Sequence, residues 1–354
     1  MSYRLATRCS RAAAPGRGRG RVQVQCSTTM KFGNVKNERL PREGNVDGDF
    51  YVDRTCIDCD TCRWMAPATF TRVGGGSSVT SQPKTKDERV DAMKALLSCP
   101  TFSIHVRQRS SEELRAAQEG LPSPIPGLPN VYHCGWHSVT SYAGTPYLIT
   151  RPASQGGNIL IDSPRYNPVL ARRLEEMGGV AVMFLTHRDD VGDHEKWAAH
   201  FKCRRVIHAL EPVPGMEVVL QGEGPWTLEG TPLEQADLVN PPEEAEPDVT
   251  LIFTPGHTQG HVCLYYAPAK AMFTGDHLCQ DDEALEDMQV FTDFNWYSVS
   301  KQLDSVRKLL QYDYLHVLPA HGRQLHLRDA AHRLEATTRL LQKHGHTTTA
   351  SATA

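Results

Sequence analysis

Residues 254–261 read Thr-Pro-Gly-His-Thr-Gln-Gly-His, and together with three other segments they decide the fold. Residues 180–194 read Val-Ala-Val-Met-Phe-Leu-Thr-His-Arg-Asp-Asp-Val-Gly-Asp-His, residues 274–277 read Thr-Gly-Asp-His, and residues 317–323 read Val-Leu-Pro-Ala-His-Gly-Arg. Each segment places His or Asp side chains on a loop at the end of an apolar strand. Because the edge of a sheet holds such loops rigidly, we expect them to form a metal site.

The order, spacing and strand context of these segments resemble the metallo-β-lactamase superfamily, from about residue 130 to residue 328. The resemblance implies an α/β fold, an αβ/βα sandwich with metals at one edge. The TPGHT-x-GH segment is most similar to the glyoxalase II branch of thioester hydrolases.

The same resemblance implies a set of metal ligands: His187, Asp189, Asp190, Asp193, His194, His257, Asp276 and His321. The first family motif is H-x-H-x-D-H, whereas this chain has H-R-D-D-V-G-D-H, which is two residues longer and lacks the second His. In the favoured register His187 is the first ligand, Asp189 or Asp190 replaces the missing His, and Asp193 with His194 forms the acid–His pair. Counting back from Asp193 without an insertion instead places Val191 and Asp189 at the two His positions.

Both registers keep one metal position, on Asp193, His194, His321 and a bridging Asp276. The second position, on His257 with His187 and a carboxylate, depends on the register. Because carboxylate is a harder ligand than imidazole, its presence shifts the preference of this position from zinc toward iron or manganese. We therefore expect one or two divalent metals, zinc first, with iron or manganese as alternatives.

Five further side chains near these motifs are weaker candidates. His261 and His277 are the last residues of the segments 254–261 and 274–277. We expect them to support neighbouring ligands or to pack in the core. His137 and the Trp296–Tyr297 pair either line a substrate pocket or pack at the edge of the sandwich.

A second metal-binding pattern lies nearer the start of the chain. Cys56, Cys59 and Cys62 have the spacing C-x2-C-x2-C, and Cys99 is followed by a proline. Three thiolates at this spacing ligate one iron–sulfur cluster locally, and a distant cysteine completes it. The stretch from Phe50 to Ile104 resembles a single-cluster 4Fe-4S ferredoxin. A structural zinc site is the alternative, although zinc ribbons favour paired C-x2-C arms.

The charge pattern of the first 37 residues separates them from the rest. They contain no Asp or Glu, and residues 1–26 hold six arginines. Such a start is typical of an organelle transit peptide, and its small residues favour the chloroplast, so we expect a stromal protein. If residues 1–26 are removed, 32 of the 38 Lys and Arg residues remain, compared with 41 Asp and Glu residues. This acidic balance and the lack of a long apolar run argue against a nucleic-acid partner and against a membrane span.

These observations give the following expected organisation: a chloroplast transit peptide at 1–26, a flexible segment at 27–48, the ferredoxin-like domain, small and α+β, at 49–107, a linker at 108–129, the sandwich at 130–343 and a disordered tail at 344–354. Expected strands cover Tyr147–Thr150, Asn158–Asp162, Val180–Thr186, Leu251–Thr254, His261–Tyr266, Ala271–Thr274 and Leu315–Pro319. Expected helices cover Lys86–Leu97, Pro168–Met177, Asp193–Phe201 and Val299–Leu310.

The resemblance leaves three functions open. The first is a metal-dependent hydrolase of a small-molecule ester, thioester or lactone, in which Asp193 binds metal and handles the proton of the nucleophile. The second is an oxidoreductase with a non-haem iron site in the sandwich, which receives electrons from the 4Fe-4S cluster and needs an electron-transfer partner. The third is a redox-sensing or binding protein with a degenerate metal site. We rank the hydrolase first.

Overall fold

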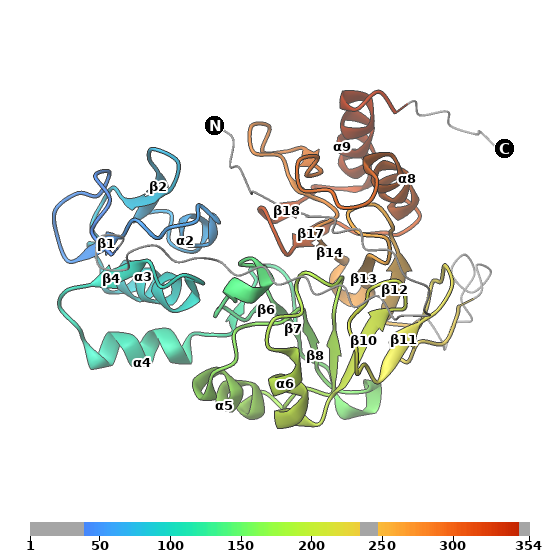
Figure 1. Ribbon diagram of the computed structural model, residues 1–354, viewed down its shortest axis with the longest axis horizontal. Coiled ribbons are helices and arrows are strands. Elements are labelled where there is room, and N and C mark those ends of the chain that lie inside the picture. Colours follow the sequence, from blue (N-terminus) through green and yellow to red (C-terminus); the bar gives the residue numbers. More distant parts are fainter. Residues whose placement is uncertain (1–38, 234–246, 347–354) are drawn as a thin grey trace, which may run out of the picture. The chain divides into compact units, whose positions relative to one another are not determined.

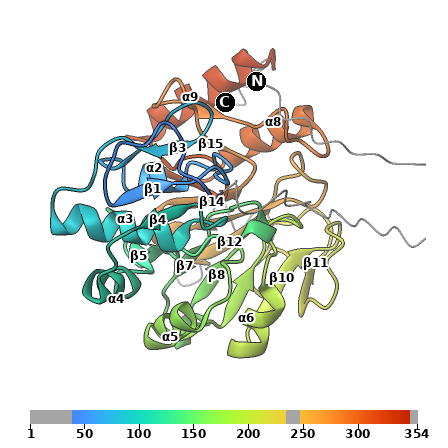
Figure 2. The ribbon, with the colours of Figure 1, turned by 60° about the vertical axis from the view of Figure 1, so that its left-hand side comes forward.

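The computed structural model describes residues 39–233 and 247–346. All of them belong to one compact unit that begins at Lys36. The expected transit peptide and residues 347–354 of the expected tail lie outside the described residues. Figures 1 and 2 show the ribbon from two directions.

Two sheets form the larger part of the molecule. The seven-stranded sheet has the order β11 (Val218–Leu220), β10 (Arg204–His208), β9 (Val182–Phe184), β8 (Ile159–Ile161), β7 (Tyr147–Ile149), β6 (Val131–His133) and β5 (Ser123–Pro124). The five-stranded sheet has the order β12 (Val249–Phe253), β13 (Val262–Tyr266), β14 (Ala271–Gly275), β17 (His316–Pro319) and β18 (Leu325–His326). A small pair, β15 (Cys279–Gln280) with β16 (Met288–Gln289), follows β14.

Helices cover the outer face of each sheet. Figures 1 and 2 place α5 (Pro168–Glu176) and α6 (His194–Phe201) beside the seven-stranded sheet, and α8 (Val299–Leu309) and α9 (Ala330–Lys343) beside the other. A buried apolar cluster that includes Phe184 and Phe273 lies between the sheets. Two other clusters join each sheet to its helices, one through Trp197 and one through Val306. The order is therefore helix, sheet, sheet, helix, which confirms the αβ/βα sandwich.

Local sequence explains where the main helices begin. The side chain of Asn167 accepts a hydrogen bond from the Leu170 N–H, and Pro168 occupies the first turn of α5, where a missing N–H costs nothing. Ser298 caps α8 in the same way. Buried residues recur along α8 at Leu303, Val306 and Leu309, so one face packs on the sheet. The expected strands and helices of this domain are confirmed to within one or two residues at most ends.

The cysteine-bearing part is small and built from short elements. Its strands are β1 (Phe50–Val52), β2 (Phe70–Arg72), β3 (Ser77–Val79) and β4 (Ile104–Val106), and its helices are α2 (Thr61–Met65) and α3 (Lys86–Ser98). β1 pairs with β4, and β2 with β3, both antiparallel. A capping box between Thr85 and Glu88 starts α3, which confirms the expected helix.

Two expectations about the segments between domains are corrected by the structure. The interval 108–129 is not a plain linker, because it holds α4 (Ser111–Glu119), capped by Ser110, and then β5, which pairs with β6 of the seven-stranded sheet. The described end of the segment expected to be flexible, residues 39–48, is tied to the cysteine unit. There the amide side chain of Asn45 bonds the backbone of Val52 and Val79. A side chain that satisfies a strand backbone orders its own segment.

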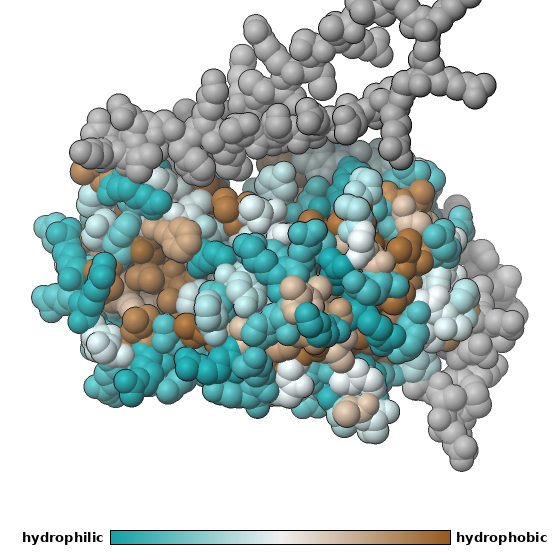
Figure 3. Space-filling view, turned by 60° about the horizontal axis from the view of Figure 1, so that its bottom comes forward, coloured by the Kyte–Doolittle hydropathy of each residue, from teal (hydrophilic) through white to brown (hydrophobic). Residues whose placement is uncertain are grey.

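Short 3-10 helices lie in three of the connections: Val139–Ser141, Ala153–Gln155 and Ala267–Ala269. Among the described residues no helix has the length and apolar character to cross a membrane. The face drawn in Figure 3 is mainly hydrophilic, with hydrophobic residues in separate groups.

Candidate metal centre

The structure brings the expected polar side chains together at the ends of strands. His187, Asp189 and Asp190 follow β9, His257 follows β12, Asp276 directly follows β14, and His321 follows β17. These strands belong to both sheets, so the site lies where the edges of the two sheets meet.

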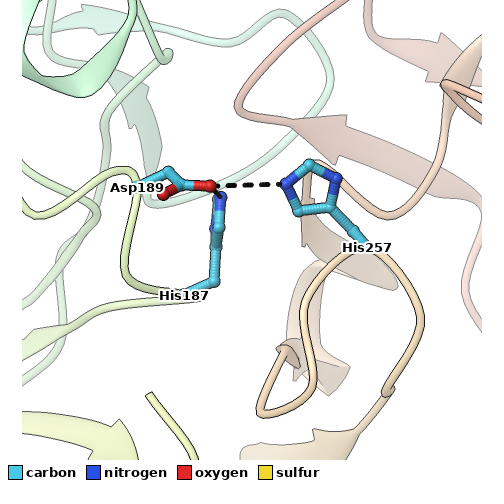
Figure 4. A group of neighbouring side chains, drawn as sticks. All are labelled: His187, Asp189 and His257. Atoms are coloured by element: carbon cyan, nitrogen blue, oxygen red, sulfur yellow. Dashed lines mark ion pairs between the residues drawn. The ribbon is translucent and has the colours of Figure 1, made fainter. Parts of the chain in front are cut away.

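Two imidazoles and two carboxylates face one another in the first half of the site. His187 Nε2 lies 3.7 Å from Asp189 Oδ2 and 3.8 Å from Asp276 Oδ2. His257 Nε2 lies 3.8 and 3.6 Å from the same two oxygens. Figure 4 shows both rings directed at the Asp189 carboxylate. Four ligands around a metal at about 2.1 Å would stand about 3.4 Å apart, so a small contraction of this group would hold a divalent ion.

The hydrogen bonds of Thr186 leave His187 in the form that binds a metal. The Thr186 hydroxyl donates to Asp162, so its oxygen accepts from the Nδ1–H of His187 at 3.0 Å. The lone pair of His187 therefore sits on Nε2, which faces the carboxylates. Burial lowers the pKa of the His187 imidazole to about 4, so the ring is neutral near pH 7.

Several donor atoms of the site are buried without a hydrogen-bond partner. They are His187 Nε2, both ring nitrogens of His257 and both carboxylate oxygens of Asp190. Buried polar atoms are nearly always paired in folded proteins, and an unpaired buried carboxylate is especially costly. A cation bound at the site would satisfy His187 Nε2, one ring nitrogen of His257 and the Asp190 carboxylate, so the residues fit a metal.

The second half of the site is made of Asp190, Asp276 and His321. His321 Nδ1 lies 2.6 Å from Asp276 Oδ1 and 4.0 Å from Asp190 Oδ2, and its Nε2 donates to the Tyr142 carbonyl at 2.9 Å. One oxygen of Asp276 thus faces this half and the other faces His187 and His257. Donor atoms of His187, Asp190 and Asp276 lie within 4.8 Å of one another, so these three side chains form a second group that could hold a metal.

The crowding of carboxylates explains the electrostatics. Burial, and next the charge of Asp276, raise the pKa of Asp190 well above its ordinary value. Burial would also raise the pKa of Asp276, but His321, His187 and His257 outweigh it and hold the pKa far below the usual range. Burial would lower the pKa of His321, but the two carboxylates raise it to about 10. The site therefore concentrates negative charge that needs a cation.

The structure does not bring Asp193 and His194 into this group, and the expected ligand set is corrected accordingly. Asp193 precedes α6, and its carboxylate accepts from the Tyr166 N–H and from Lys196. The Nδ1 of His194 contacts Arg205 at 3.0 Å. The extra residues that end in Gly192 lead the chain away from the site before α6 begins. The metal position that both registers keep thus lacks two of its expected ligands. The side chains of the position that depends on the register, on His187 and His257, do lie together.

Two buried carboxylates that the sequence interpretation missed support the ligand loops. Asp162 accepts from both the N–H and the hydroxyl of Thr186. Glu211 accepts from the Arg188 N–H at 3.2 Å and from the Gly260 N–H at 2.8 Å, and so ties the loop of His187 to the loop of His257. Asp162 lies at the end of an expected apolar strand, and this is the same sequence pattern that identified the metal ligands. Glu211 follows β10, a strand that the sequence pattern did not predict.

The weaker candidates have different positions. His261 and His277 are fully buried, and the rings of His261 and His187 are 5.3 Å apart, so both pack behind the ligands as expected. His137 is fully buried. Trp296 is 55% exposed, and its backbone N–H donates to the His257 carbonyl at 2.8 Å, so its backbone lies beside the His257 loop.

The four expected cysteines meet in the smaller domain. Cys56, Cys59, Cys62 and Cys99 all line one pocket, and none forms a disulfide. Burial raises the pKa of the Cys59 thiol to about 11, while Thr61 opposes this shift and Cys99 and Cys56 add to it. Four thiols converging on one apolar pocket fit a 4Fe-4S cluster, because iron binding supplies the charge that makes the thiolates stable there.

Fold and sites together define a metal-binding αβ/βα sandwich joined to an iron–sulfur module. Residues 182–321 match the model of the metallo-beta-lactamase superfamily, and residues 52–106 match the model described as the 4Fe-4S single cluster domain of ferredoxin I. Both matches agree with the two resemblances that the sequence analysis found.

Curated relatives resemble part of the chain. A hydroxyacylglutathione hydrolase of Nostoc punctiforme is 30% identical over 127 residues, which cover 34% of this chain and 43% of that protein. A protein of the same name from Synechocystis is 26% identical over 151 residues, covering 41% and 52%. The chain thus spans about half the length of the curated relatives it matches. Among solved structures, the BLEG-1 B3 metallo-beta-lactamase is 17% identical, with a TM-score of 0.41 and coverage of 56% of this chain and 94% of that one.

Proposed function

We propose that the protein is a metal-dependent hydrolase of a small-molecule ester, thioester or lactone, and that it carries a 4Fe-4S cluster. The observation that carries the proposal is the set of buried, unpartnered donor atoms on His187, His257 and Asp190, which converge with Asp189 and Asp276. Such a set is expected of a metal site and is costly without one.

Each ligand residue has a distinct part in this proposal. His187, His257 and Asp189 would hold one metal, Asp190 and His321 would hold a second, and Asp276 has one carboxylate oxygen toward the ligands of each. A divalent ion bound there supplies Lewis-acid activation of a water and of the substrate carbonyl. Because Asp190 lies near both Asp276 and His321, in the part of the site where Asp193 was expected, we assign the handling of the nucleophile's proton to Asp190.

The proposed substrate class rests on two supports. Several curated relatives are named hydroxyacylglutathione hydrolase, which favours a thioester. The second is Trp296, which is exposed and whose backbone N–H bonds the His257 carbonyl, so we assign its indole to contact with the acyl or alcohol part of a small molecule. We keep esters and lactones in the proposed class, because the same metal chemistry cleaves them.

The experiment that tests this function is zinc reconstitution followed by a substrate panel. Purified protein is loaded with zinc and assayed with hydroxyacyl-glutathione thioesters, other thioesters, esters and lactones. We expect turnover of at least one class in wild type and its loss in His257→Ala, with Trp226→Phe, a buried substitution away from the ligand loops, as the control for folding. Turnover that persists in His257→Ala, or an inert zinc-loaded protein, contradicts the proposal.

One observation favours a second candidate, an oxidoreductase with iron in the sandwich and an external electron-transfer partner. Carboxylates supply three of the converging ligands, Asp189, Asp190 and Asp276, and hard oxygen ligands suit iron or manganese better than zinc. In this alternative the cluster passes electrons to the sandwich site. Iron in excess of acid-labile sulfide, with consumption of oxygen or nitric oxide, would favour it over the hydrolase. We propose a chloroplast location for either activity, which an N-terminus of the isolated protein at Met1 would contradict.

A further inference from the structure

A continuous set of contacts joins the cysteine pocket to the sandwich site. It begins at Cys59, whose Sγ lies 3.4 Å from the hydroxyl of Thr61. The same hydroxyl lies 3.3 Å from Nδ1 of His137, which belongs to the sandwich domain. Thr61 is 3% exposed and His137 is fully buried, so water does not screen this part of the connection.

The hydrogen-bond partners of His137 determine which atoms donate and which accept along this set of contacts. Its Nδ1–H donates to the Ala143 carbonyl at 2.8 Å, and its Nε2 lies 2.8 Å from Nε2 of His133. With Nδ1 protonated, His137 Nε2 accepts from His133, and the Thr61 hydroxyl is free to donate to the Cys59 sulfur. A hydrogen bond to a ligating sulfur is one of the features that set the reduction potential of a cluster.

Beyond His137, the loop 138–145 reaches the metal site directly. The carbonyl of Tyr142 accepts from His321 Nε2 at 2.9 Å, and the Thr145 N–H donates to the Ala320 carbonyl at 2.8 Å. Gly144 lies against Asp190 so closely that a Cβ there would stand 2.7 Å from Asp190 Oδ1. The loop therefore packs on ligands of the second metal position and has no room to move independently of them.

A second connection runs along the surface. Arg323, two residues after His321, binds Asp60 with Nε–Oδ2 at 2.6 Å and Nη2–Oδ1 at 3.2 Å. Asp60 lies between Cys59 and Cys62 in the cluster loop. Because Arg323 is 41% exposed, we expect this pair to contribute less than the buried path.

We propose that the cluster and the sandwich metal are thermodynamically coupled through Thr61, His137 and the loop 138–145, so that metal binding raises the reduction potential of the cluster. The sign follows from charge: a divalent cation favours the cluster state that holds one more electron. By linkage, one-electron reduction of the cluster tightens metal binding by the same factor. The coupling rests on the metal and cluster sites of the proposed function, and it does not depend on which bond the enzyme cleaves.

The test measures the midpoint potential of the cluster in the full chain. Protein purified anaerobically is treated with a chelator that spares the cluster and is then reloaded with zinc, which is redox-inert. Electron paramagnetic resonance follows reductive titration with dithionite in both states. We expect a higher potential with zinc, and a tenfold coupling of affinity corresponds to 59 mV for one electron.

Substitutions along the connection test which residues carry the coupling. We expect Thr61→Val and His137→Gln to reduce the zinc-dependent shift by half or more, whereas Thr61→Ser retains it. Because the readout is a difference between two metal states, a direct effect of Thr61 on the potential cancels. Arg173→Gln removes a contact between α5 and the Glu119 carbonyl, on the exposed surface, and should leave the shift unchanged. If His137→Gln loses the cluster, Thr61→Val tests the same path.

Each result bears on a different claim. Zinc bound at the sandwich with no change in cluster potential overturns the coupling and leaves the hydrolase proposal intact. A full shift in both Thr61→Val and His137→Gln overturns the assigned path. Failure of the wild-type protein to bind zinc, measured by metal analysis before the titration, overturns the proposed metal site and the coupling with it.

Discussion

Asp276 and His321 form the shortest contact between ligands of the metal site, with Oδ1 and Nδ1 2.6 Å apart. The other oxygen of Asp276 lies 3.6 and 3.8 Å from the imidazole nitrogens of His257 and His187. One carboxylate thus connects ligands that come from both sheets of the sandwich. This arrangement predicts a site whose two metal positions fail together when Asp276 is lost.

Asp190 and Asp193 are a matched pair of positions for mutation, because Asp190 faces the metal site and Asp193 does not. Asp190 is fully buried with both oxygens unpartnered, while Asp193 bonds Tyr166 and Lys196 outside the site. We expect Asp190→Asn to lower zinc affinity and turnover by about 10- to 100-fold or more. We expect Asp193→Asn to keep turnover and to lose about 1 kcal/mol of stability. Isothermal titration with zinc, together with kinetics, checks both, and the reverse pattern would reinstate Asp193 as the ligand.

Glu211 should act on metal affinity without touching the metal. Its two oxygens accept from the backbone of both ligand loops, at Arg188 and Gly260, and Glu211→Gln replaces one acceptor with a donor. We expect metal affinity or turnover to fall about tenfold or more. Glu217→Gln, which alters a partly exposed pair with Arg205, is the control and should retain both. Wild-type affinity in Glu211→Gln would show that the two loops need no such tie.

Trp197 and Trp296 should differ sharply in their effect on stability. Trp197 is fully buried between α6 and the seven-stranded sheet, and its indole N–H donates to the Pro164 carbonyl at 2.8 Å. We expect Trp197→Ala to lower the free energy of unfolding by about 3–5 kcal/mol. Trp296 is exposed, so Trp296→Ala should change stability by less than about 0.5 kcal/mol and act on KM instead. Denaturant unfolding and substrate kinetics measure the two effects separately.

The buried His137 makes stability depend on pH in a defined window. Burial is the main cause that lowers the pKa of His137 to about 4, compared with about 6.5 in the unfolded chain. Between these values the unfolded chain binds the proton and the folded chain does not, so stability is complete above pH 6.5 and falls as the pH drops toward 4. We expect His137→Gln to reduce the slope of unfolding free energy against pH between 6.5 and 5. An unchanged slope would mean that His137 is protonated in the folded protein.

The sequence predicted the parts of the fold that have strong local patterns. Apolar strands such as Val182–Phe184 and amphipathic helices such as Val299–Leu309 were recognisable because burial imposes a period on them. The strands Arg204–His208 and Val218–Leu220 were not predicted, because the first begins with two arginines and the second is short and half exposed. The helix Ala330–Lys343 was also not predicted, although Asp329 caps it.

For the site, motif spacing pointed to His187, His257, Asp276 and His321, which the structure brings together, and to the acid–His pair Asp193 and His194, which it does not. The letters Asp-His at 193–194 match the family motif, yet the turn through Gly192 carries them to the start of a helix. Whether a carboxylate faces the metal or a neighbouring helix depends on how the chain turns over two or three residues. Glu211 could not be recognised from sequence, because its role depends on two backbone N–H groups that only the tertiary structure brings together.

The most direct test of the central claim is metal analysis of anaerobically purified protein, with acid-labile sulfide, before and after chelation, combined with thioester and ester hydrolysis on the same samples. Our account predicts iron and sulfide in equal amounts from the cluster, zinc in addition, and hydrolysis that disappears with zinc and returns when zinc is restored. Iron in clear excess over sulfide, with no hydrolysis by the zinc-loaded protein, would contradict it.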